Sequence, residues 1–148
     1  HRMKLDAIRR YRAQVEDVLR MDLLQARQNL QDVENLCQAL DAQTQESVEQ
    51  YSAKVSAGMA LEEFVEWQAT FDSEAALLTQ ARQTEGRLRD VWSQKQQDLR
   101  EAMQERRTLD RLAERVRIQE QAVRNRAEQM QMDEAARRTG AMGVQNSL

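Results

Sequence analysis

The stretch Ser56-Ala57-Gly58-Met59-Ala60 separates two very long segments whose sequence patterns are helical. Gly58 is the only glycine between these two segments, and the chain contains no proline. A glycine just past the end of a helix can adopt the left-handed backbone conformation that closes the helix at little steric cost. We therefore predict a bend over 56–60 that folds the chain back on itself as a hairpin.

The segment before the bend, residues 4–57, carries apolar residues at alternating spacings of three and four. This spacing is typical of the seam of a coiled coil. The predicted seam skips Arg12, and it contains two stutters, at 15–19–23 and 40–44–48, which should locally unwind the supercoil. Its members are Ile8, Val15, Leu19, Leu23, Ala26, Leu30, Val33, Cys37, Leu40, Thr44, Val48, Tyr51 and Val55.

The segment after the bend, residues 61–138, follows the same rule. Its apolar seam comprises Phe64, Trp67, Phe71, Ala75, Leu78, Ala81, Leu88, Trp92, Leu99, Ala102, Leu109, Ala113, Val116, Val123, Ala127 and Met130. Polar residues at seam positions weaken a coiled coil but help to fix its register; here they are Glu85, Lys95, Arg106 and Glu120. Gly86 either permits close approach or a slight bend, or is a tolerated surface glycine.

These patterns predict an all-α protein: one long antiparallel two-helix coiled-coil hairpin over 3–138, whose second helix is longer than the first. A bend at Gly58–Met59 makes residues face each other when their numbers add to about 117. The second helix then continues alone over about 114–138. Its exposed apolar stripe favours a partner, and a frayed or self-associating tail is the alternative. We expect His1-Arg2 to be a vector remnant and 139–148 a flexible tail.

Composition and motifs argue against enzymatic chemistry. The only histidine is His1, and the 148 residues contain no Gly-rich phosphate loop, no CxxC and no HExxH. Two helices bury a narrow seam, so a small-molecule pocket is not expected. Cys37 is the single cysteine and lies on the seam, where a buried, inert thiol is typical. We predict no enzyme, no cofactor and no metal site.

Charge is balanced overall but segregated along the hairpin. The net charge of −3 gives no reason to expect nucleic acid or an anionic membrane as the main partner. No basic residue lies between Lys54 and Arg82, so the bend end is acidic, whereas both segments are arginine-rich at the opposite end. The two ends therefore suit different partners; the alternative is that the charges only solubilise the helices.

Four of the six aromatic residues lie near the bend: Tyr51, Phe64, Trp67 and Phe71. They either pack over the end of the hairpin as a plug or remain partly exposed as anchors for a partner.

The chain resembles the FliJ family of bacterial flagellar export proteins and its YscO-type relatives in virulence secretion. The residues that carry the resemblance are the helix start Lys4-Leu5-Asp6, the bend Ser56-Ala57-Gly58, the stretch Phe64-Val65-Glu66-Trp67-Gln68, and the long Arg/Gln-rich second helix. It covers nearly the whole chain.

The resemblance implies a non-catalytic, stalk-like coiled coil, monomeric alone, in the cytoplasm and peripherally associated with the inner membrane. Its implied partners are a hexameric export ATPase (FliI-like), an export-gate membrane protein (FlhA-like) and export chaperones. Together with the charge pattern, this suggests ATPase binding by Arg9, Arg10, Arg106, Arg107 and Arg111.

The family's gate-binding surface lies near the bend and is rich in Tyr, Leu and Phe. Carried over to this chain, it comprises Leu36, Leu40 and Trp67. The chain departs from the family pattern at Thr70 and Glu74, where Phe and Leu are expected, and Phe71 is the neighbouring replacement. The rival functional classes are a structural or adaptor coiled coil that homodimerises, a rotary-ATPase stalk subunit and a prefoldin-type chaperone. The last two need strands or a globular domain that no segment here supplies.

Overall fold

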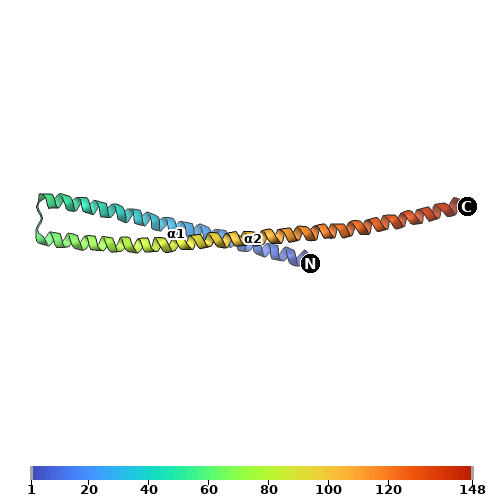
Figure 1. The fold of residues 1–148 in the computed structure, drawn as a ribbon, viewed down its shortest axis with the longest axis horizontal. Coiled ribbons are helices and arrows are strands. Elements are labelled where there is room, and N and C mark those ends of the chain that lie inside the picture. Colours follow the sequence, from blue (N-terminus) through green and yellow to red (C-terminus); the bar gives the residue numbers. More distant parts are fainter. Residues whose placement is uncertain (1, 148) are drawn as a thin grey trace. The chain divides into compact units, whose positions relative to one another are not determined.

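A computed structural model describes the backbone of residues 2–147, with side-chain burial for residues 3–143. It contains two helices, α1 (Arg2–Ala57) and α2 (Leu61–Ser147), and no strand within the described residues (Figure 1). The prediction of an all-α hairpin with a longer second helix is confirmed. No stretch of either helix, as far as the structure describes them, is both long and apolar enough to cross a membrane.

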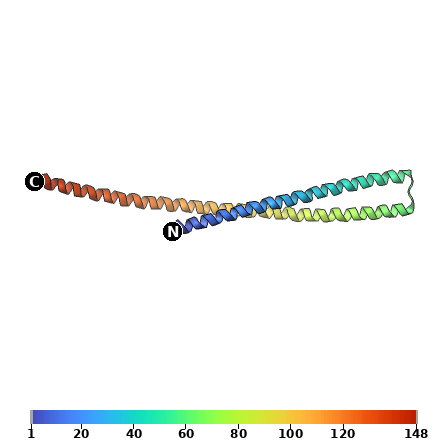
Figure 2. The ribbon, with the colours of Figure 1, turned by 180° about the vertical axis from the view of Figure 1, so that it is seen from behind.

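The chain divides into two compact units. Unit 2 spans 15–102 and includes the bend, and unit 1 joins residues 1–14 to residues 103–148. Each unit contains part of α1 and part of α2. Within unit 1, α2 continues well past the start of α1, as both ribbon views show (Figures 1 and 2).

The bend lies where the sequence predicts it. Gly58 has φ of +100°, in the left-handed region that favours glycine. Its amide N–H donates to the carbonyl of Val55 at 3.2 Å, which closes the last turn of α1. The amide of Phe64 donates to Ala60 at 3.1 Å and opens α2. Glu62 and Glu63 lie in this first turn, where carboxylates interact favourably with the helix dipole.

The seam of α1 is an unbroken heptad, and the predicted stutters are wrong. Glu16 is 2% exposed, and Ser47 is half-buried, whereas Val48 is 48% exposed. Arg12, which the prediction skipped, lies on the seam. The buried or half-buried positions that follow steps of four and three are Leu5, Arg9, Arg12, Glu16, Leu19, Leu23, Ala26, Leu30, Val33, Cys37, Leu40, Thr44, Ser47 and Tyr51.

The seam of α2 follows the same heptad and keeps all four predicted polar positions. Glu74 takes the seam position predicted for Ala75, and Ala75 itself is exposed. Phe64, also predicted on the seam, is 45% exposed. The seam runs through Trp67, Phe71, Glu74, Leu78, Ala81, Glu85, Leu88, Trp92, Lys95, Leu99, Ala102, Arg106, Leu109, Ala113, Val116 and Glu120. An uninterrupted 3.5-residue repeat is typical of a left-handed supercoil.

Ion pairs confirm the predicted register. In unit 1, Arg12 pairs with Glu105, and in unit 2, Lys95 pairs with Asp22; the residue numbers of each pair add to 117. Arg82 and Asp41, whose numbers add to 123, are joined at 3.1 Å.

One further expectation is corrected, and one of the alternatives left open for Gly86 is excluded. The helix does not end at 138, because α2 continues through Gly140 and Gly143 to Ser147. A Cβ atom at Gly86 would meet nothing within 4 Å, so this glycine does not serve close approach of α1. The flexible tail and the vector remnant stay predictions; His1 and Leu148 lie outside the described residues.

Candidate partner-binding surfaces

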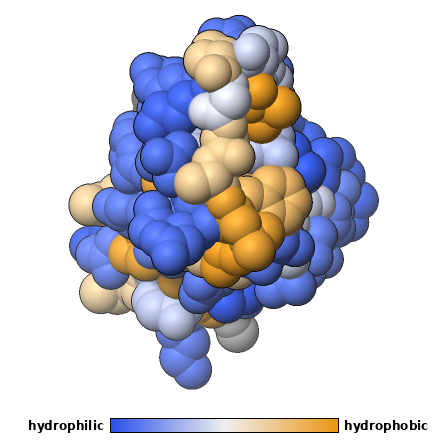
Figure 3. Space-filling model, turned by 90° about the vertical axis from the view of Figure 1, so that its left-hand side faces the viewer, coloured by the Kyte–Doolittle hydropathy of each residue, from blue (hydrophilic) through white to orange (hydrophobic). Residues whose placement is uncertain are grey.

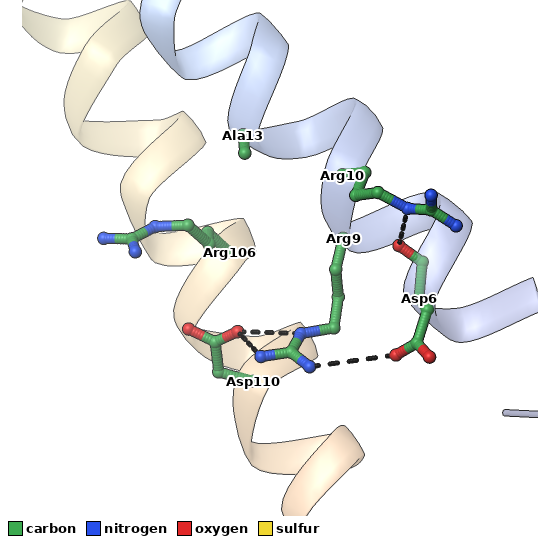
Figure 4. Close-up of a pocket in the computed structure, with 6 residues that line it drawn as sticks. All are labelled: Asp6, Arg9, Arg10, Ala13, Arg106 and Asp110. Carbon is green, nitrogen blue, oxygen red and sulfur yellow. Dashed lines mark hydrogen bonds and ion pairs between the residues drawn. The ribbon is translucent and has the colours of Figure 1, made fainter. Parts of the chain in front are cut away.

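In unit 1, Arg9 is held in place by acidic neighbours. Its Nε donates to Asp110 Oδ1 at 3.1 Å, and a second guanidinium nitrogen lies 3.0 Å from the same oxygen (Figure 4). Asp6, one turn earlier on α1, approaches the guanidinium to 3.9 Å. Arg9 therefore joins α1 to α2. Its guanidinium is used inside unit 1, so its role there is structural.

Arg10 and Arg106 lie on the two helices beside this pair. Arg10 is exposed, and its Nε donates to the backbone carbonyl of Asp6 at 3.4 Å. Arg106 is half-buried on the seam, and its guanidinium points away from Arg9 and Asp110 (Figure 4). Together with Ala13, these residues line a shallow surface groove. The structure thus brings Arg9, Arg10 and Arg106 together, with the acids Asp6 and Asp110 between them.

Arg107 and Arg111 do not line this groove. Like Arg10, they are exposed and make no ion pair among the described residues. They occupy outward positions of the α2 heptad. Arg115 repeats the spacing of four and is also exposed and without an ion pair within the described part of the chain. Residues at this spacing lie on one side of a helix. We call Arg107, Arg111 and Arg115 the arginine face; Arg115 was not among the predicted ATPase-binding residues, although its spacing could have included it.

The acids next to the arginine face are engaged by other cations. Glu105 pairs with Arg12, and Asp110 with Arg9. Glu114 accepts two hydrogen bonds from Arg117, at 2.7 and 3.1 Å. These hydrogen bonds lower the pKa of the Glu114 carboxyl. None of these three acids is paired with a member of the arginine face among the described residues.

In unit 2, two of the predicted gate residues belong to an aromatic cluster around Tyr51. The ring centroid of Tyr51 lies 5.3 Å from Phe71, 6.0 Å from Trp67 and 6.4 Å from Phe64. Lys54 Nζ lies 5.4 Å from the Trp67 ring centre, at cation–π distance. Trp67 and Phe71 are half-buried. The aromatic residues therefore pack as a plug near the bend, and Phe64 keeps part of its ring exposed.

The other two predicted gate residues lie farther along α1. Leu36 is 49% exposed, whereas Leu40 is half-buried on the seam. Tyr51 follows Leu36 by fifteen residues, roughly 22 Å at 1.5 Å per residue. Leu36 therefore lies well away from Tyr51 along α1, and the role of all four residues in gate binding stays a prediction.

A buried carboxylate that the sequence reasoning missed lies between these two groups. Glu74 is 7% exposed, and Ser47 Oγ donates to its Oε1 at 2.6 Å. Its second oxygen, Oε2, is buried and has no hydrogen-bond partner in the described structure. Only strict heptad counting from Trp67 and Phe71 would have placed Glu74 on the seam.

Cys37 is buried on the seam, as predicted. Burial is the main cause that raises the pKa of its thiol, and a hydrogen bond with Glu85 adds to it. The same hydrogen bond lowers the pKa of the Glu85 carboxyl, with help from Arg89. The thiol is therefore kept protonated, which makes it a poor nucleophile. Within the described residues, no group of His, Cys, Asp and Glu is arranged to hold a metal ion.

Comparison with known proteins identifies the family. The family model for the flagellar FliJ protein matches residues 1–142. No curated protein and no solved structure matches the chain significantly. Because the matched range includes the bend, both helices and both candidate surfaces, the chain belongs to the flagellar FliJ protein family.

Proposed function

We propose that this protein is a stalk-like coiled coil that couples a hexameric export ATPase to the export gate and assists delivery of substrates and chaperones. Membership in the FliJ family implies a flagellar export role that is structural rather than enzymatic. The proposal adds the two partners and assigns one surface to each. It also places the protein in the cytoplasm, peripherally at the inner membrane.

The arginine face is the observation that carries the proposal. Arginines spaced four apart on one helix repel each other and destabilise it slightly. The neighbouring acids Glu105, Asp110 and Glu114 pair with other cations, so Arg107 and Arg111 have no ion-pair partner among the described residues of unit 1. A partner with an acidic surface would supply the missing charges and speed association. We assign this partner as the export ATPase, with Arg10 at the edge of the contact.

Binding of the purified full chain to its export ATPase tests this assignment. Arg111→Glu should weaken binding about tenfold at low salt, because it turns an attraction into a repulsion. Arg87→Glu is the matched control: Arg87 is also exposed on α2 and makes no ion pair among the described residues, but it lies in unit 2.

The double variant Arg107→Glu/Arg111→Glu should weaken binding further, and circular dichroism should show unchanged helicity. Arg9 and Arg106 are unsuitable for this test, because they lie on the seam and their reversal would disturb unit 1 itself. Equal affinity of the double variant and the control at moderate salt would falsify the assignment.

The gate assignment rests on the aromatic cluster. Trp67 is half-buried beside Tyr51 and Phe71, so its exposed edge can contact a partner while the rest of the ring packs in the hairpin. Trp67→Ala should impair gate binding more than it lowers Tm. A loss of Tm with unchanged gate affinity would make Trp67 a core residue only.

A homodimeric structural coiled coil is the second candidate, and the exposed stretch of α2 favours it. Every residue over 121–143 is exposed, including Val123, Ala127 and Met130, which continue the heptad. Sedimentation of the purified chain separates the two candidates. The stalk-like proposal expects a monomer, whereas a structural coiled coil would bury this stripe in a dimer.

A further inference from the structure

Exposed apolar side chains gather at the bend end of unit 2, outside the seam. Leu61 is 78% exposed, Val48 48%, Val55 47% and Phe64 45%. An end-on view shows an apolar strip across this end of the hairpin, with hydrophilic residues on both sides (Figure 3). Single exposed apolar residues are common on protein surfaces, but a contiguous group beside a hollow indicates a binding site.

The register places these residues on one edge of the hairpin. Val55 and Leu61 have numbers that add to 116, as do Val48 and Gln68, so both pairs face each other across the two helices. On α2, Leu61, Phe64 and Gln68 follow spacings of three and four, which keeps them on one side of the helix. We call Val48, Val55, Leu61 and Phe64 the tip strip.

A hollow of 250 Å³ opens beside the tip strip, lined by Tyr51, Phe64, Gln68 and Phe71. Three of its walls are aromatic rings, and the fourth is a side-chain amide that can donate and accept hydrogen bonds. Aromatic-lined hollows of this kind hold the anchor residues of protein interfaces. The hollow is large enough for one apolar side chain of a partner.

The charges around the tip strip are negative and lack counter-ions. Glu49, Glu62 and Asp72 are exposed and make no ion pair within the described residues. Lys54 is the only nearby cation, and it lies over the Trp67 ring. No basic residue occurs between Lys54 and Arg82. An apolar strip with unbalanced carboxylates on its borders complements a surface that is apolar in the centre and cationic at the rim.

We propose that the tip strip binds a cationic amphipathic helix of a partner protein. One apolar residue of that helix enters the aromatic hollow, others cover Val55 and Leu61, and Lys or Arg residues pair with Glu62 and Asp72. Helix-in-groove recognition uses anchors spaced in this way. The inference uses no residue of unit 1, so it is independent of the ATPase assignment; it rests on the proposed function only in sharing the aromatic cluster, including Phe71, with the gate assignment.

The test uses the full chain and a synthetic helical peptide composed of leucine and lysine, with a matched peptide in which glutamate replaces lysine. NMR spectra of methyl-labelled protein should show the lysine peptide shifting Val48, Val55 and Leu61, while Leu24 and Leu77 stay unchanged. The glutamate peptide should shift none of them. Leu24 and Leu77 are suitable references because they are 71% and 53% exposed in the same unit and belong to neither candidate surface.

Affinity measurements use matched double variants. Val55→Ser/Leu61→Ser should weaken peptide binding at least about tenfold. Leu24→Ser/Leu77→Ser, with similar exposure, should change it less than about twofold. Glu62→Gln/Asp72→Asn should weaken binding and flatten its salt dependence. All substituted residues are exposed, so helicity should be retained.

Three results overturn the proposal. The first is a set of shifts spread equally over Leu24, Leu77 and the tip strip, which would indicate non-specific attraction. The second is full peptide affinity in Val55→Ser/Leu61→Ser. The third is binding of phosphatidylcholine vesicles, lost in that same variant, without peptide binding; this would assign the tip strip to a lipid surface.

Discussion

Units 1 and 2 share one heptad but fill it with different chemistry. Where burial is described, every fully buried apolar side chain belongs to unit 2: Ala26, Leu30, Val33, Cys37, Ala81 and Ala102. Seam positions of unit 1 instead carry Arg9 and Arg12, which pair with Asp110 and Glu105. Apolar burial is nearly independent of salt, whereas exposed ion pairs each contribute about 1 kcal/mol or less and are screened. The heptad therefore determines which positions of the two helices are in contact. The residues at these positions determine how stable the contact is.

The largest effect is expected in the seam of unit 2. Leu30 is 1% exposed, so Leu30→Ala removes buried apolar atoms and leaves a cavity. The free energy of unfolding should fall by about 3 kcal/mol. Urea denaturation measures this, with Leu24→Ala as control, because Leu24 lies on the same helix and is 71% exposed. A loss below about 1 kcal/mol would contradict a packed seam in unit 2.

An intermediate effect of opposite sign is expected at Glu74. This buried carboxylate has one oxygen without a partner in the described residues, so its desolvation is only partly offset. Glu74→Leu should raise the free energy of unfolding by about 1–2 kcal/mol. Glu66→Leu, at an exposed position of the same helix, should change it by less than about 0.5 kcal/mol. If Glu74→Leu instead lowers the free energy of unfolding, the hydrogen bond between Ser47 and Glu74 stabilises the protein more than an apolar contact would.

The smallest effect is expected in the seam of unit 1. A double-mutant cycle on Arg12 and Glu105 should give a coupling energy of about 0.2–1 kcal/mol at low salt, because both side chains are partly exposed. In 1 M NaCl this coupling should nearly vanish, while the effect of Leu30→Ala stays the same. A coupling energy that does not respond to salt would remove the contrast between the two units.

The sequence predicted the fold well because periodicity and one glycine determine it. The long 3/4 spacing requires two helices, and the positive φ of Gly58 requires a bend at that residue. Register followed from the bend, so the pairs Arg12–Glu105 and Lys95–Asp22 were predictable to within one turn. The end of α2 was not, because Gly140 and Gly143 resemble helix stops but lie within the helix.

The errors in the seam have a common cause. Choosing apolar residues moved the predicted seam to Val48 and Ala75, whereas the heptad continues through Ser47 and Glu74. Apolar residues tend to be buried, but here the heptad spacing, and not apolar character, determines which residue lies on the seam. For the candidate sites, the sequence located the arginine-rich and aromatic regions. It could not tell which arginines are used internally, because that depends on side-chain geometry at Arg9 and Asp110.

The three-residue connection between α1 and α2 also sets an order of folding. Tyr51 and Phe64, whose rings are 6.4 Å apart, are close in sequence, whereas Arg9 and Asp110 are separated by 101 residues. Closing a short loop costs less chain entropy than closing a long one, and contacts between distant residues form late. The two helices should therefore zip from the bend outward. The ion pairs of unit 1 would form last and open first, so hydrogen exchange should begin near the start of α1 while amides around Leu30 stay protected.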